Sequence, residues 1–181
     1  MKILFSRIIV VLSVLGALLY FHLRPVHASS STVAHVENGF EFTVKAPLKT
    51  AAPLFGSFAE RSWGRDWDPQ FLYPQPPHDV RGEVFTVAHG HLLSTWVNTA
   101  FDLDGGHIQY VYVVPEVQAV LIDIRLQQKD AHTTAAKVVY QRTALVPALN
   151  DHVIELGRKD LESGKEWESQ INGYLQANQG K

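Results

Sequence analysis

The stretch that decides the fold is HIQYVYVVPEVQAVLIDIRLQQKDAHTTAAKVVYQRTAL, residues 107–145. Apolar and polar residues alternate along most of it, which is the period of a β-strand with one buried face. Pro115-Glu116 and Asp130-Ala131 interrupt the alternation with residues that favour tight turns. The pattern predicts three consecutive strands, at His107–Val114, Gln118–Lys129 and His132–Leu145.

Two further strands are predicted when this pattern is followed toward the N-terminus. Gly90 and Asp104-Gly105-Gly106 are turn residues, and they bound two more alternating segments at Glu83–His89 and His91–Asp102. A separate strand is predicted at His35–Val44, where apolar residues occupy every second position over most of the segment. Short connections between strands favour antiparallel pairing, so we expect an antiparallel meander.

Two segments of different character separate the first strand from the meander. Residues 47–63 are rich in Ala and open with Pro47, which suits a first helical turn, so one or two short helices are predicted there. Residues 64–82 contain four prolines together with Trp67, Phe71 and Tyr73. An irregular loop that carries large apolar side chains usually covers another part of the protein.

A long helix is predicted from Pro147 to about Ala177. Its apolar residues recur at steps of three or four, or multiples of these, as in an amphipathic helix, at Ile154, Leu161, Trp167, Ile171 and Leu175. This helix is expected to cover the apolar face of the sheet, which makes an α+β domain. Gly157 and Gly164 lie near the same stripe, and either room for a ligand or close helix–sheet contact would explain them.

The first 28 residues resemble an export signal. Lys2 and Arg7 precede an apolar run of 14 residues, and Val26 and Ala28 are small residues at the positions that a signal peptidase recognises. The run is shorter than the ~20 residues that cross a bilayer. We predict an exported protein, periplasmic or extracellular, and expect membrane association only if the N-terminal segment stays uncleaved. The predicted organisation is a signal peptide at 1–28, a linker at 29–34 and one domain at 35–178.

Charge and composition exclude several classes of function. Without residues 1–28 the chain has 13 basic and 18 acidic side chains, a net charge of −5, so no nucleic-acid partner is expected. The absence of cysteine excludes disulfides, thiolate nucleophiles and thiolate metal sites. We expect no cofactor.

Several short motifs in this chain resemble those of the SRPBCC superfamily (START-like, Bet v 1-like, polyketide cyclase-like), over about residues 36–175. They are Ala59-Glu60-Arg61-Ser62-Trp63, Trp67-Asp68-Pro69-Gln70-Phe71, Gly82-Glu83-Val84-Phe85, Val139-Tyr140-Gln141-Arg142-Thr143-Ala144-Leu145 and Trp167. The resemblance implies a helix-grip fold, in which a curved antiparallel sheet wraps around a long C-terminal helix, with two short helices after the first strand. It also implies a cavity used for lipids, sterols, plant hormones or polyketides. Members include carriers, sensors, regulators and a minority of cyclases and hydrolases, so the fold alone does not decide function.

Strand alternation predicts which side chains face the helix. The face richer in apolar and aromatic residues also holds three Tyr, one Trp, one Asn and one Arg, and a few polar groups among apolar walls are typical of a small-molecule pocket. Tyr and Trp also occur in ordinary cores with hydrogen-bonded polar ends, so a filled core stays open as an alternative. The predicted ligand-binding residues are Glu60, Trp63, Phe85, Trp96, Tyr110, Tyr112, Tyr140 and Arg142.

Arg142 shares strand parity with Tyr140 and Ala144, so its guanidinium is predicted to point into the interior. A buried guanidinium keeps its charge and needs a partner. Two candidates are predicted for that partner, Glu60 or an acidic or carbonyl group of the ligand itself.

The predicted function is non-catalytic binding of a hydrophobic or aromatic small molecule, such as a lipid, sterol or polyketide-like compound. Two alternatives stay open: a cyclase- or hydrolase-type enzyme that uses Tyr or His as acid and base, and a protein-interaction module whose interior is filled. His89-Gly90-His91 resembles a pair of metal ligands, with Asp102 or His107 as a third. A solvated turn explains it better, and we predict no metal and no catalytic residues.

Overall fold

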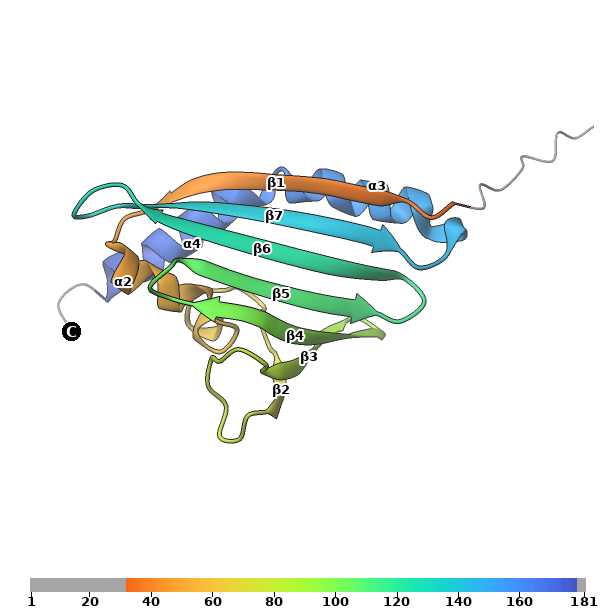
Figure 1. Cartoon of the computed structure of the whole chain (residues 1–181), viewed down its shortest axis with the longest axis horizontal. Helices are drawn as coiled ribbons and strands as arrows, with labels where there is room; N and C mark the ends of the chain where they lie inside the picture. The colour runs from red at the N-terminus through yellow and green to blue at the C-terminus, as the bar shows by residue number, and fades with distance from the viewer. Residues whose placement is uncertain (1–31, 179–181) are drawn as a thin grey trace, which may run out of the picture. The chain divides into compact units, whose positions relative to one another are not determined.

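Seven strands form one antiparallel sheet in the computed structural model, which describes residues 32–178 (Figure 1). The predicted signal peptide and the first half of the linker lie outside the described residues. Along the sheet the strands follow the order β1-β7-β6-β5-β4-β3-β2. Their bounds are β1 His35–Val44, β2 Gln70–Tyr73, β3 Val84–His89, β4 Leu92–Asp102, β5 His107–Val114, β6 Gln118–Gln128 and β7 Thr134–Ala144.

The five predicted meander strands are confirmed as β3 to β7, and the predicted first strand as β1, which pairs with β7. The loop prediction for residues 64–82 was wrong in one part, because Gln70–Tyr73 pairs with β3 as the edge strand β2. The prolines that suggested an irregular loop flank this strand without interrupting it, and Pro is compatible with a sheet edge.

Turn chemistry sets the register of the hairpins. Gly106, between β4 and β5, has a left-handed backbone with φ +63°, and a side chain there would meet the Leu126 carbonyl oxygen. Only glycine satisfies both conditions without strain. Downstream, β5 and β6 pair from His107↔Arg125 to Val114↔Gln118, which keeps the buried residues of both strands on one face.

The short helices after β1 and the C-terminal helical segment lie on the same side of the sheet (Figure 1). The C-terminal segment is divided by a turn at Leu161 and Glu162, so the continuous helix expected from its pattern consists of two consecutive helices. α3 contacts both β1 and β7, while α4 contacts β1. The helical elements are α2 Leu48–Ala51, η1 Ala52–Phe55, η2 Ala59–Ser62, η3 Pro147–Leu149, α3 Asn150–Asp160 and α4 Ser163–Ala177.

The predicted inward face of the sheet is confirmed by burial. On β5, Ile108, Tyr110, Tyr112 and Val114 are buried, and the same parity holds on β6 and β7. The side chains of Phe40, Phe42 and Val44 extend this apolar face onto β1. The hydrophobic core therefore lies between the sheet and the helices, and it encloses a cavity.

Candidate ligand-binding site

A cavity of about 80 Å³, here called the central cavity, lies between the sheet and α4. Its walls come from η1, η2, the loop before β2, five strands and α4. All but one of its side chains are aromatic or aliphatic: Phe55, Glu60, Trp67, Phe85, Trp96, Tyr110, Ile122, Ile124, Tyr140 and Trp167. Concave, mainly aromatic walls with one ionisable group are typical of small-molecule sites.

Ring packing around Trp96 fixes the shape of the sheet-side wall. The Trp96 ring stacks on Tyr112 with centroids 4.1 Å apart and on Phe85 with centroids 5.6 Å apart. Trp67 meets the same indole edge-on at 5.6 Å, and the indole Nε1 of Trp96 donates to Ser94 Oγ at 2.7 Å. These contacts leave the rings few alternative rotamers, so the wall is preorganised.

Glu60 supplies the carboxyl group of the cavity wall. Its short helix η2 is held in place by Asp79, whose carboxylate accepts the backbone N–H of Phe58 at 2.6 Å and of Ala59 at 3.1 Å. Within residues 32–178 the Glu60 carboxyl group has neither a hydrogen-bond partner nor a counter-ion. Burial raises the pKa of Glu60 to about 8, and the negative charge of Asp79 adds to this effect.

A second buried acid lies behind the cavity wall. Glu83 is fully buried and accepts a hydrogen bond from Ser57 Oγ at 2.8 Å, and burial raises its pKa to about 7. Its second oxygen Oε2 and both amide atoms of Asn98 are buried with no hydrogen-bond partner among the described residues. Asn98 pairs in register with Tyr110, whose hydroxyl donates to the Phe55 carbonyl at 3.0 Å. Acidic groups therefore cluster at this end of the interior.

Arg142 points into the interior as predicted, but its partner is Asp160 of α3, and the prediction of Glu60 was wrong. Arg142 Nε and Nη2 donate to the two Asp160 carboxylate oxygens at 2.7 and 2.6 Å. Nη1 donates to Tyr112 Oη at 2.8 Å and to Gln118 Oε1 at 3.3 Å. The guanidinium also lies 5.0 Å from the Tyr140 ring centroid. Asp160 is close to β7 in the sequence and lies on α3, which packs against β7. Glu60 lies instead on η2, in the wall of the central cavity.

A second depression of about 330 Å³, here called the outer pocket, lies beside this ion pair. Tyr112 and Arg142 form part of its lining together with Leu92, Val114, Val117, Gln118, His152 and Leu156. The stacked rings of Trp96 and Tyr112 lie between it and the central cavity, since Trp96 lines only the latter. The Arg142 charge is already neutralised there by Asp160, so it is not an open anion site.

The predicted site residues divide into three groups. Five of the eight line the central cavity: Glu60, Phe85, Trp96, Tyr110 and Tyr140. Tyr112 and Arg142 line the outer pocket instead. Trp63 lines neither, because its indole Nε1 donates to the Leu54 carbonyl at 2.7 Å and its ring packs edge-on against Trp167.

Sequence reasoning missed several wall residues. Trp67 belongs to the loop at residues 64–82, which was expected to cover another part of the protein. The aromatic residues of that loop were the feature of the sequence that pointed to it. Trp167 was assigned to the buried stripe of the helix but not to the site. Phe55 lies on a short helix, and nothing in its sequence neighbourhood distinguishes it from other core residues.

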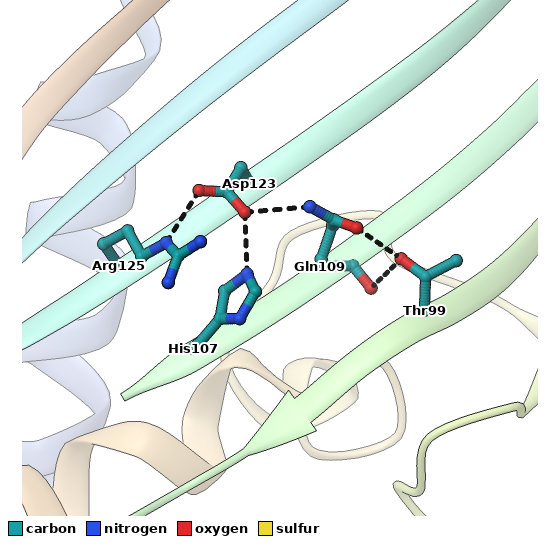
Figure 2. Close-up of polar contacts among 5 residues, drawn as sticks. All are labelled: Thr99, His107, Gln109, Asp123 and Arg125. Atoms are coloured by element: carbon teal, nitrogen blue, oxygen red, sulfur yellow. Dashed lines mark hydrogen bonds and ion pairs between the residues drawn. The ribbon is translucent and has the colours of Figure 1, made fainter. Parts of the chain in front are cut away.

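A polar network occupies the outer face of the sheet, away from both cavities (Figure 2). Asp123 is its centre and accepts hydrogen bonds from His107 Nε2 at 2.7 Å, Gln109 Nε2 at 3.0 Å and Arg125 Nε at 2.9 Å. Partial burial acts to raise the pKa of Asp123, but these hydrogen bonds outweigh it and lower that pKa. Because side chains alternate along β5 and β6, the network faces away from Tyr110 and Ile122.

His107, one of the two residues considered as a third ligand beside the His89-Gly90-His91 turn, instead pairs with Asp123. The side chain of His89 is outside the described part of the structure. Among the side chains that are described, no three His, Asp or Glu residues gather as metal ligands. None of the helices within residues 32–178 combines the length and the hydropathy of a membrane span.

The fold and the site together define a helix-grip protein with an internal, aromatic-walled cavity. Norcoclaurine synthase from Thalictrum flavum, crystallised with dopamine and hydroxybenzaldehyde, is similar in structure with a TM-score of 0.56 at 9% identity, over 87% of this chain and 95% of that chain. Ara h 8.0201 gives a TM-score of 0.55 at 17% identity, over 80% of this chain and 100% of its own. An uncharacterised Rhizobium leguminosarum protein gives 0.55 at 17%, over 81% and 98%.

These likenesses confirm the predicted fold class, a Bet v 1-like helix-grip fold. No family model matches the sequence, and no curated protein is significantly similar to it. Because one fold hosts many functions, the neighbours' ligands are not transferred to this chain.

Proposed function

We propose that the protein binds a small, mainly apolar or aromatic molecule in the central cavity without converting it, in the periplasm or outside the cell. The observation that carries the proposal is the cavity itself, with seven aromatic side chains and a single carboxyl group in its lining. Aromatic surface supplies contact area at a low entropic cost, and one polar group orients the ligand.

The size of the cavity limits the ligand. At about 80 Å³ it is smaller than the ~150 Å³ engineered cavity that accepts benzene. A compound of a few heavy atoms fits this space, and a lipid or sterol fits only if the wall moves. The segment that carries Trp67 belongs to neither a helix nor a strand, so such a movement there would not break a helix or a strand ladder.

Native mass spectrometry of protein purified from its own host tests the proposal. The wild type is expected to carry a retained small molecule. Ile122→Phe, which adds a ring to the cavity wall, is expected to lose that molecule, whereas Val113→Phe adds the same ring to a partly exposed position and should retain it. A wild type that carries nothing, with or without added aromatic compounds, would instead support a filled core.

Export is a separate part of the proposal. It is supported by the signal-like segment at residues 1–28, and the expected mature N-terminus is Ser29. Intact mass of the exported protein tests it, and a form that begins at Met1 contradicts cleavage.

An enzyme is the second candidate, favoured by Glu60. A carboxyl group with a pKa near 8 in a mainly apolar cavity is suited to proton transfer near neutral pH. Tyr110 and Tyr140 are less suited than Glu60 to act as acid or base, because burial raises the pKa of both above the usual value. The retained molecule, incubated with fresh protein and analysed for conversion, separates this candidate from simple binding.

A further inference from the structure

The interior contains more acidic than basic side chains. Arg142 and Asp160 form a closed pair, with both carboxylate oxygens engaged by the guanidinium at 2.6–2.7 Å. The remaining interior acids are Glu60, Asp79 and Glu83, and none of them forms an ion pair with Lys or Arg in the described structure. The end of the interior that adjoins the central cavity is therefore acidic, and no Lys or Arg side chain of residues 32–178 forms an ion pair with these acids.

Glu60 is the acid of this group that reaches the central cavity. Asp79 is occupied by two backbone N–H groups and Glu83 by Ser57, whereas the Glu60 carboxyl group has no partner within residues 32–178. A carboxylate that lines a mainly apolar cavity without a partner is costly, so an occupant that supplies positive charge is favoured over one that does not.

The rest of the wall is equally suited to a cation. Seven of the lining side chains are aromatic, and aromatic rings attract ammonium groups, most strongly for Trp and when water is excluded. An aromatic box closed by one carboxylate is the arrangement that recognises methylated ammonium ions. An anionic ligand finds no comparable partner here, because Arg142 is committed to Asp160.

Resting on the proposed binding function, we propose that the ligand of the central cavity is a small organic cation, an alkylated ammonium group paired with Glu60 inside the aromatic walls. Three polar atoms that lack partners, Glu83 Oε2 and the Asn98 amide oxygen and nitrogen, lie beside Tyr110 at the same end of the interior and add to its negative or hydrogen-bonding character. The proposal concerns the chemical class of the ligand and leaves the choice of compound to experiment.

Binding of a cation in this site must be coupled to loss of the Glu60 proton. The unliganded Glu60 is mainly protonated at pH 7, because burial, Asp79 and the surrounding apolar walls disfavour its charge. Tyr110 and Tyr140 also face Glu60, but the raised pKa of both keeps them neutral in this range. A cation binds the ionised form, so its affinity should rise about tenfold per pH unit below pH 8 and level off above it.

Isothermal titration with tetramethylammonium and with tert-butyl alcohol, a neutral compound of similar size, tests the proposal. Tetramethylammonium has no proton of its own, so any pH dependence belongs to the protein. We expect it to bind with proton release and at least tenfold more tightly than the alcohol at pH 8. Glu60→Gln should lower the affinity for the cation at least tenfold and remove the pH dependence, while Glu166→Gln, at an exposed site on α4, should change neither.

Each outcome bears on one proposal or both. Equal binding of the alcohol and the cation, unaffected by Glu60→Gln, overturns the cation proposal and leaves cavity binding intact. If neither probe binds, the molecule retained in native mass spectrometry decides: a compound with an ammonium group supports the cation, a neutral or acidic compound overturns it. Binding of neither probe, with nothing retained, overturns both proposals.

Discussion

At the scale of single residues, Arg142 carries a charge that the fold neutralises inside the protein. The guanidinium and the Asp160 carboxylate are both nearly buried, at 7% and 5% exposed. A pair of this kind gains little over an apolar pair of the same shape, because both groups have been taken out of water. Breaking it is another matter, since one charge is then left without a partner.

Arg142→Ala is therefore expected to destabilise the protein by about 3–5 kcal/mol, measured by urea unfolding at pH 7. The loss comes from the stranded Asp160 carboxylate and from the hydrogen bond donated to Tyr112. Adding Asp160→Ala should recover part of it, since the unpaired charge is then removed.

Glu60→Ala is the matched control for this double-mutant cycle. Glu60 has no ion pair with Arg142 among the described contacts, so the effects of Arg142→Ala and Glu60→Ala should add within about 0.5 kcal/mol. A coupling larger with Glu60 than with Asp160 would mean that the ion pair of the structure is not the one present in solution.

At the scale of elements, the buried stripe of the C-terminal helices differs from the apolar stripe of their sequence. The residues that face the sheet follow one another at steps of four and three, whereas Leu161 is 56% exposed at the turn between the helices. Apolar periodicity had selected Ile154 in α3, Leu161 at the turn, and Trp167, Ile171 and Leu175 in α4. Ile154 and Leu161 are not the residues that face the sheet, because the small Gly157 and the charged Asp160 occupy the contact positions there. The inward residues are Val153, Gly157, Asp160, Gly164, Trp167 and Ile171.

The structure decides between the two explanations of Gly157 and Gly164, room for a ligand and close helix–sheet contact. A β-carbon at Gly157 would lie 2.9 Å from Val36 Cγ2 and 2.9 Å from Asn38 Nδ2, and one at Gly164 would lie 3.1 Å from Phe40. Close packing on β1 therefore explains them, and neither residue lines the central cavity.

Gly157→Leu should destabilise the protein by about 1–3 kcal/mol, because the added side chain must displace β1. Gly173→Leu is the control on α4, where a β-carbon has no neighbour within 4 Å, and it should stabilise by up to about 1 kcal/mol through helix propensity. Thermal unfolding measures both changes. Equal stability of the Gly157→Leu variant would restore the explanation in which the glycine leaves room for a ligand.

At the scale of the whole molecule, strand alternation and turn chemistry were sufficient to predict β1, β3 to β7 and the inward face of the sheet. Both depend on neighbours in the chain, which is why they can be derived from sequence. The site was predicted less completely, because a cavity wall joins residues from distant segments. Trp67, Trp167 and Glu60 meet only when the loop, the helix and η2 are folded over the sheet. Strand parity could orient Arg142 toward the interior but could not match it to Asp160.

Buried acids also give the molecule a predictable pH dependence of stability. The folded-state pKa of Glu83 is about 7 against a usual value of 4.5, because burial disfavours the charged form. Between these values the folded state holds more protons than the unfolded state, so the free energy of unfolding falls as pH rises. Glu60, with a pKa of about 8, acts in the same direction. Asp123 acts oppositely and only at lower pH, since its pKa is depressed. Stability should therefore be greatest near pH 4–5, contrary to the usual neutral maximum.

Glu83→Gln isolates the part of this effect that comes from the fully buried Glu83. The amide keeps the shape of the side chain and can still accept the Ser57 hydroxyl, but it has no charge to desolvate. Urea unfolding at pH 4.5 and pH 8 should show equal stability for the variant and the wild type at the lower pH, and a variant more stable by about 3 kcal/mol at the higher pH. Glu60→Gln added to Glu83→Gln should flatten the remaining slope, whereas the exposed Glu166→Gln should leave it unchanged. A Glu83→Gln variant that loses stability toward pH 8 as steeply as the wild type would show that Glu83 is ionised in the folded protein, and would require a counter-ion that pairs with it.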